Sequence, residues 1–259
     1  MLGYEMIGEG RTTKVYRDGN RALKLYVNAP PDEAYNEAKK QIFAVRAGLP
    51  VPEVYGVKQL EEGVALEMQY INGVEIVRPG MDKNQRRIAF ESFVCLQCLV
   101  HRVETEELPK LAHKLAWKIE HAPVLGTTKI DALLNQLQLL DSDKKSLCHG
   151  DFHVSNVLVS GDKLWIIDWV DAACGDPLAD ACRTYLLLRQ YISRMAGIYL
   201  RLFCKASSVQ QEEVLKWLPI VAAGRLHENI NRQEMTFLLN LLHDNHLTLC
   251  KNDLDLPNT

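Results

Sequence analysis

The sequence predicts an α+β fold with two lobes, a small sheet with one helix followed by a larger, mainly helical lobe. Up to residue 72 the chain alternates short strand-like runs with one amphipathic helix. After Gly73 the apolar residues recur at helical spacing, except around 147–168, where two apolar runs flank a turn. Neither a repeat nor a linker separates these parts. We therefore expect lobes over 1–72 and 73–259 rather than independent domains.

Composition excludes several classes of partner. The 259 residues, 47% of them hydrophobic, suffice for an ordinary core. Thirty basic and 33 acidic residues, with no long run of either sign, argue against a nucleic-acid partner. The first residues lack the pattern of a signal peptide, and arginines interrupt the longest apolar helical stretch. Seven scattered cysteines fit reduced thiols. We expect a soluble cytoplasmic protein with no membrane partner.

The first lobe is predicted from turn and cap signals. Strands are expected over 4–7, 14–17, 21–26, 54–58 and 64–70, with Asp18-Gly19 as a hairpin turn. A helix is expected after Pro30-Pro31, because acidic residues fill its first turn and Gly48 follows it. Its expected core-facing stripe consists of Tyr35, Ala38, Ile42 and Val45.

A hairpin in the second lobe brings polar residues together. Residues 157–159 and 164–167 are apolar runs separated by Ser-Gly-Asp-Lys, a turn sequence. Because hairpin strands are antiparallel, Asn156 before the first strand and Asp168 after the second fall at the same open end. Asp151 lies in the loop that leads to this end.

These side chains are typical of phosphoryl transfer. Amide and carboxylate oxygens from Asn156 and Asp168 suit Mg²⁺, which completes its octahedron with water and phosphate oxygens. Asp151 is then free to align an acceptor hydroxyl or accept its proton. Catalysis of phosphoryl transfer consists mostly of such positioning and charge neutralisation.

Two segments at this spacing resemble a known family. HGDFHVSN, residues 149–156, resembles the catalytic loop of the aminoglycoside phosphotransferase and choline kinase family, whose members are relatives of protein kinases. IIDW, residues 166–169, resembles the metal-binding segment of that family. The resemblance extends from about residue 4 to residue 246. It implies a two-lobed protein-kinase-like fold, ATP or GTP as the phosphoryl donor, and Mg²⁺.

The resemblance also implies roles in the first lobe. GEGRTTKV, residues 8–15, resembles a phosphate-covering loop, although a threonine stands where protein kinases have the third glycine. Its candidate nucleotide-binding residues are Gly8, Gly10, Thr12 and Thr13, and the two threonines fit a simple turn equally well. Lys24 is similar to the lysine that meets the α- and β-phosphates, with Glu37 as its ion-pair partner and Glu33 as the alternative.

The remaining roles follow from the same resemblance. MQYING, residues 68–73, resembles the hinge between lobes, where backbone groups of Gln69 and Ile71 would bind the purine. Asp151 is the implied catalytic residue, and Asn156 and Asp168 are the implied metal ligands. His149 is expected to brace the catalytic loop, and Asp180 to tie this loop to a helix.

The acceptor is expected to be a small alcohol. Only a few residues separate Asp168 from Asp176-Pro177, where the next helix is expected to begin, so no activation segment is present to dock a peptide. An aminoglycoside-type phosphotransferase is the first expectation, and a kinase for choline, homoserine or thiamine is the alternative. Asp171 and Glu228 could hold a cationic acceptor, but solvated helix-face residues are the preferred interpretation.

Two other classes stay open at this point. A pseudokinase would keep the fold and bind nucleotide without turnover, although all the catalytic positions are filled. A metal-dependent hydrolase would use the alternating His149, Asp151 and His153 as ligands. The hydrolase leaves the first seventy residues unexplained and is the least favoured class.

Overall fold

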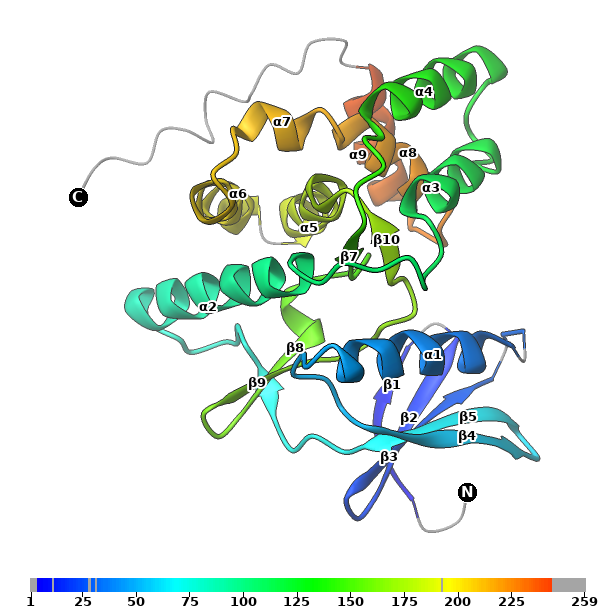
Figure 1. The fold of residues 1–259 in the computed structure, drawn as a ribbon, viewed down its shortest axis with the longest axis vertical. Helices are drawn as coiled ribbons and strands as arrows, with labels where there is room; N and C mark the ends of the chain where they lie inside the picture. The colour runs from blue at the N-terminus through cyan, green and yellow to red at the C-terminus, as the bar shows by residue number, and fades with distance from the viewer. Residues whose placement is uncertain (1–3, 11, 28, 31, 192, 244–259) are drawn as a thin grey trace. The chain divides into compact units, whose positions relative to one another are not determined.

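The structure, a computed structural model, describes residues 4–243 except 11, 28, 31 and 192. The chain forms two compact units (Figure 1). The first consists of residues 1–89 with 154–172, and the second of residues 90–153 with 173–259.

The first unit contains an antiparallel five-stranded sheet in the order β1-β2-β3-β5-β4. Its strands are β1 (Glu5–Glu9), β2 (Thr13–Asp18), β3 (Arg21–Tyr26), β4 (Val54–Leu60) and β5 (Gly63–Gln69). Each lies where the sequence predicts a strand, with ends that differ by at most three residues. Strands β3 and β5, at the centre of the sheet, are buried over most of their length. Their successive side chains point to opposite faces, so Tyr26, Val64 and Leu66 belong to one apolar cluster and Leu23, Leu25 and Ala65 to another.

Helix α1 (Asp32–Arg46) lies along one face of this sheet, as Figure 1 shows. The predicted core-facing stripe is right for Ala38, which is buried, but wrong for Tyr35 and Ile42, which are 48% and 41% exposed. The buried face consists of Ala34, Glu37, Ala38, Gln41 and Ala44. Small alanine side chains let the helix pack closely on the apolar residues of β3 and β5. The same face directs Glu37 toward the sheet.

The predicted hairpin completes the first unit. It consists of β8 (Val157–Ser160) and β9 (Lys163–Ile166), joined by a turn in which Gly161 has a φ of +59°. A short strand, β6 (Val74–Glu75), pairs with β8. The 3-10 turn η1 (Val154–Asn156) precedes β8, and the N–H of Ile167 donates to the carbonyl oxygen of Asn156 at 3.0 Å. The prediction that Asn156 and Asp168 reach the same end of the hairpin is confirmed.

The second unit is mainly helical, as predicted. Its elements are α2 (Lys83–His101, whose first turns belong to the first unit), α3 (Leu111–Glu120), α4 (Thr127–Leu140), β7 (Ser146–Cys148), β10 (Ala173–Gly175), α5 (Pro177–Tyr191), α6 (Ser193–Ser207), α7 (Gln211–Leu215), α8 (Leu218–Leu226) and α9 (Arg232–His243). Helix α5 packs against α6, α7 and α8, and β7 pairs with β10. Asp176 caps α5 by accepting the N–H of Leu178 at 2.8 Å. Within the described ranges, the structure has no helix long and apolar enough to cross a membrane.

Candidate active site

A buried lysine joins two carboxylates in the first unit. Lys24 lies in the middle of β3, and its Nζ donates to Glu37 Oε1 of α1 at 2.9 Å and to Asp168 Oδ1 at 3.0 Å. The hydroxyl group of Tyr26 also donates to Glu37. Glu37 is therefore the partner of Lys24, as predicted, and the alternative partner, Glu33, is not needed. The sequence separation between Lys24 and Asp168 is 144 residues, so only the fold brings them together.

Charge stabilises this lysine in spite of its burial. The side chain of Lys24 is 8% exposed and that of Glu37 is 1% exposed. Burial alone would lower the pKa of Lys24, but the carboxylates of Glu37 and Asp168 outweigh that effect and raise its pKa. Burial also raises the pKa of Glu37, so its negative charge depends on the nearby ammonium group. Lys24 is thus held as a fixed cation beside Asp168.

Asp168 and Asn156 offer hard oxygen donors at the mouth of the hairpin. Asp168 has a φ of +66°, a left-handed conformation that aspartate adopts more readily than most residues, and its side chain is 42% exposed. Asn156 is buried directly before β8, and the hairpin register places it across from Ile167. One amide oxygen and one carboxylate fit Mg²⁺, which takes its other ligands from water and phosphate.

The predicted phosphate-covering loop connects β1 to β2 at the edge of the same sheet. The N–H of Gly10 donates to the carbonyl oxygen of Thr13 at 2.8 Å, and the N–H of Val27 donates to that of Thr12 at 3.0 Å. A Cβ atom on Gly10 would lie 3.0 Å from the hydroxyl oxygen of Thr13, so a side chain there would crowd the turn. Gly8 pairs with Val15 across β1 and β2. The carbonyl groups of Thr12 and Thr13 therefore stabilise this turn at the start of β2, whether or not their hydroxyl groups contact phosphate.

The predicted hinge follows β5. The N–H of Gln69 donates to the carbonyl oxygen of Glu53 at 2.7 Å, and the carbonyl oxygen of Ile71 accepts from the N–H of Gly73 at 3.0 Å. These bonds occupy one backbone group of each predicted purine-binding residue.

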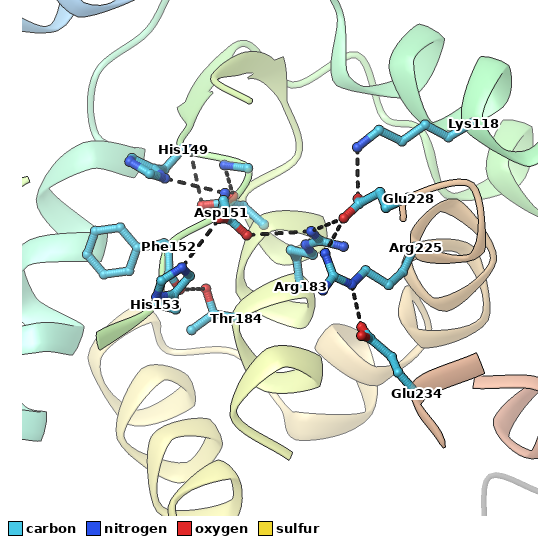
Figure 2. A network of polar contacts seen from close by, with 12 residues as sticks. Lys118, His149, Asp151, Phe152, His153, Arg183, Thr184, Arg225, Glu228 and Glu234 are labelled. Atoms are coloured by element: carbon cyan, nitrogen blue, oxygen red, sulfur yellow. Dashed lines mark hydrogen bonds and ion pairs between the residues drawn. The ribbon is translucent and has the colours of Figure 1, made fainter. Parts of the chain in front are cut away.

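Asp151 lies in the second unit, in the loop after β7, and Figure 2 shows its surroundings there. Its Oδ1 lies 3.5 Å from Arg183 Nη2, and its Oδ2 lies 3.4 Å from His153 Nε2. Its backbone N–H donates to His149 Nδ1 at 3.3 Å. The side chain of Asp151 is 28% exposed, so its carboxylate has defined partners and remains accessible to solvent.

The predicted catalytic loop is fixed by buried residues, as expected for His149 and Asp180. Asp180 on α5 accepts the N–H of Gly150 at 2.7 Å and that of His149 at 3.4 Å, and it also contacts His101 Nε2 at 2.8 Å. Burial alone would raise the pKa of Asp180, but these partners outweigh it and lower that pKa. The ring of His149 is fully buried and packs edge-on against Phe152. Both residues therefore act on the loop from within the core.

Glu228 occupies a position that differs from the preferred prediction. Instead of lying on a solvated helix face, its side chain is only 18% exposed and contacts three cations from α3, α5 and α8. None of these three cations, Lys118, Arg183 and Arg225, was predicted as a site residue from the sequence. One sequence signal could have identified these cations: a charged residue at a core-facing position of an apolar helix. Arg183 in ADACRTYLLL is an example.

With this geometry in place, comparison with known families identifies the chain. A family model described as the phosphotransferase enzyme family matches residues 4–218. The chain belongs to this family. The match includes Lys24, the catalytic loop and Asp168, and it ends at the start of α8. A comparison with the curated proteins found no significant match.

Solved structures share the fold of this phosphotransferase. A thermostable aminoglycoside phosphotransferase APH(4)-Ia in ternary complex with ADP and hygromycin B has a TM-score of 0.69 at 15% identity, over 92% of this chain and 91% of that chain. The choline kinase LicA from Streptococcus pneumoniae has a TM-score of 0.67 at 15% identity, over 93% of both chains. The aminoglycoside-3'-phosphotransferase of type VIII has a TM-score of 0.65 at 19% identity, over 86% of this chain and 94% of that chain.

Proposed function

We propose that this phosphotransferase transfers the γ-phosphoryl group of ATP to a hydroxyl group of a small molecule. The observation that carries the proposal is the buried Lys24, which donates to both Glu37 and Asp168. Asp168 in turn lies beside Asn156 at the open end of the hairpin. Membership of the family supports it, and so does the ADP complex of a structure with the same fold. GTP remains the alternative donor.

The reaction assigns one step to each group. The acceptor oxygen attacks the γ-phosphorus atom, the bond from this atom to the β,γ-bridging oxygen breaks, and ADP leaves. Asp151 aligns the acceptor hydroxyl and takes its proton, while Lys24 binds the α- and β-phosphates. Glu37 holds Lys24 in place.

Asn156 and Asp168 would hold Mg²⁺, which supplies charge neutralisation at the phosphate oxygens. The nucleotide would lie on residues 1–72, under the loop with Gly8, Gly10, Thr12 and Thr13. Gln69 and Ile71 would bind the purine through backbone groups. We assign catalysis and the acceptor to residues 73–259.

The acceptor class is aminoglycoside-like, or alternatively a metabolite such as choline, homoserine or thiamine. The similarity in fold to both aminoglycoside phosphotransferases and a choline kinase supports this choice. The hydrolase alternative is disfavoured by a contact, because His149 Nδ1 already accepts the N–H of Asp151 in a buried ring. We place the enzyme in the cytoplasm, where ATP is supplied and where its described cysteines, all free thiols, would stay reduced.

The test measures Mg²⁺-dependent ADP release from ATP and from GTP. Acceptors are added singly from a panel of aminoglycosides, choline, ethanolamine, homoserine, thiamine and methylthioribose. We expect one acceptor class to stimulate release, and Asp151→Asn to lower the stimulated rate about 10²- to 10⁴-fold because the general base is lost. The affinity of the variant for ATP, measured by calorimetry, is expected to stay within about twofold of wild type.

Each other result has a definite meaning. Nucleotide binding with no stimulation by any acceptor would favour the pseudokinase class. A comparable loss of ATP affinity in Asp151→Asn would show that Asp151 belongs to the nucleotide site. Failure to bind either nucleotide would refute the proposal.

A further inference from the structure

The catalytic aspartate lies at one end of a chain of ion pairs that extends to α9. Arg183 Nη2 contacts Asp151 at 3.5 Å and Glu228 Oε2 at 3.0 Å. Arg225 contacts Glu228 through its Nη1, and its Nε contacts Glu234 Oε1 at 2.6 Å. Figure 2 shows the five side chains in this order. We call this set, Asp151, Arg183, Glu228, Arg225 and Glu234, the relay.

We propose that Arg183 and Glu228 are positioning residues that set the protonation and orientation of Asp151, with Glu228 limiting the positive charge that Arg183 presents to it. The proposal deepens the proposed function, because it concerns the general base of that reaction. It also goes beyond it, because neither residue needs to touch nucleotide or acceptor.

Geometry and burial support this role. A single nitrogen atom of Arg183 serves two carboxylates, so any change in its contact with Glu228 alters its contact with Asp151. The side chain of Arg183 is 10% exposed, which keeps water from screening these contacts. Arg183 lies on α5, two turns before the end of this helix, and is therefore held by the core of the unit.

Charge balance supports the same role. The relay and Lys118, which contacts Glu228 Oε1 at 2.9 Å, contain three carboxylates and three cations. Burial would raise the pKa of Glu228, but Arg183, Lys118 and Arg225 outweigh it and lower this pKa to about 2. Glu228 therefore stays negative throughout the range in which aspartate usually titrates. Removing its charge leaves Arg183 less compensated.

The groups that contact Asp151 within the described part of its unit include Arg183 from α5 and the two histidines of its own loop. His149 accepts the backbone N–H of Asp151 through Nδ1, and its ring is buried. His153 contacts Oδ2 and is left unchanged in every variant below, so it is present in all of them.

The test is a titration of the Asp151 carboxyl group by carbon-13 NMR in the full-length protein labelled at aspartate. The signal is assigned by its loss in Asp151→Asn. We expect Arg183→Gln to raise the titration midpoint of Asp151 by about one pH unit, because the adjacent cation is lost. We expect Glu228→Gln to lower it by about half a unit, because the cation becomes less compensated.

Matched variants separate this effect from a loss of structure. Arg183→Lys and Glu228→Asp keep the charges, and we expect each to restore most of the corresponding shift. Glu234→Gln removes a buried carboxylate of the same relay that contacts Arg225 rather than Arg183, and we expect a smaller shift than for Glu228→Gln. A merely structural role would not move the midpoint in opposite directions for the two charge-removing variants.

The outcomes are distinct from those of the activity test, because the titration uses neither nucleotide nor acceptor. Opposite shifts establish the relay even if no acceptor is found. Midpoints that agree within about 0.2 units in all variants, or that move in the same direction for Arg183→Gln and Glu228→Gln, overturn the proposal whatever the enzyme phosphorylates. If one charge-removing variant does not fold, the midpoint of the charge-keeping variant at that position is compared with the midpoints of both variants at the other position.

Discussion

At the scale of single residues, Lys24 is a buried charge that two carboxylates hold in place. Lys24 donates to Glu37 of helix α1 and to Asp168 at the end of the hairpin. The hydroxyl group of Tyr26, on the same strand as Lys24, also donates to Glu37 and orients it. A buried ion pair stabilises little relative to apolar residues, but breaking one side of it is costly. The site therefore depends on both partners being present.

We expect Lys24→Met to lower the free energy of unfolding by about 3–5 kcal/mol, because Glu37 is left buried and unpaired. The double variant Lys24→Met/Glu37→Gln should recover at least half of this loss, since no uncompensated buried charge remains. Urea unfolding followed by circular dichroism measures both. Equal stability of the single and double variants would show that the pair contributes no coupling energy.

Site residues that belong to short motifs were predictable from the sequence. The hairpin register predicted Asn156 and Asp168, the family resemblance implied Lys24 and Glu37, and the structure brings all four into one unit. Arg183, Arg225 and Lys118 were missed, because they lie in apolar helices in which each looks like an isolated surface charge. A local pattern can mark such a charge as core-facing, but its ion-pair partners are defined only when the three helices pack.

At the scale of elements, the strands were predicted more reliably than the buried face of α1. Turn residues fix where a strand begins and ends, so Asp18-Gly19 and residues 160–163 located both hairpins. The helix presents two faces that could be buried, and the large apolar residues Tyr35 and Ile42 favoured the wrong one. Close packing on the sheet selects alanine instead, a steric effect that hydrophobicity alone does not predict.

The turn between β4 and β5 depends on a glycine. Gly63 has a φ of +146°, and a Cβ atom there would lie 2.3 Å from the carbonyl oxygen of Tyr26 in β3. We expect Gly63→Ala to destabilise the protein by about 3 kcal/mol or more, because both strain and a clash with backbone arise. Thermal unfolding measures the loss.

Gly80→Ala is the matched control for this prediction. Gly80 also has a positive φ, +85°, but a Cβ atom there meets open space among the described residues. Its cost is expected to be that of backbone strain alone, about 1–2 kcal/mol. Similar losses in the two variants would mean that Tyr26 and its strand move away at little cost.

At the scale of the whole molecule, the sequence predicted the fold class because its main features are local. A run of five strands with one helix, then helices interrupted by a hairpin, can be read from periodicity and turns. The grouping of the hairpin with the first compact unit could not be read in this way. That grouping depends on contacts such as the bond from the N–H of Ile166 to the carbonyl oxygen of Pro50 at 2.8 Å, which joins residues more than a hundred positions apart.

Global stability is expected to depend on pH through Glu228. Its pKa is about 2 in the folded state and about 4.3 when unfolded, so it contributes stability above about pH 4 that is lost as the pH falls toward 2. We expect Glu228→Gln to be less stable than wild type by about 3 kcal/mol at pH 7, with the difference vanishing near pH 2. Urea unfolding at a series of pH values measures it.

Glu9→Gln is the control for this pH dependence. Glu9 is an exposed residue of β1 whose carboxylate lies 3.5 Å from Lys14, a surface pair. Its removal should change stability by less than about 1 kcal/mol at any pH. A constant difference between Glu228→Gln and wild type from pH 7 to pH 2 would assign the loss to packing instead of charge.

The relay also has a consequence for how this chain can vary. Its five residues lie between positions 151 and 234, yet each carries a charge that a neighbour in the relay compensates. Substitutions in such a set are not additive, because the second change meets an environment that the first has altered. A single change exposes an unmatched charge, whereas a paired change removes both members at once. The relay is therefore expected to be inherited, or lost, as one unit.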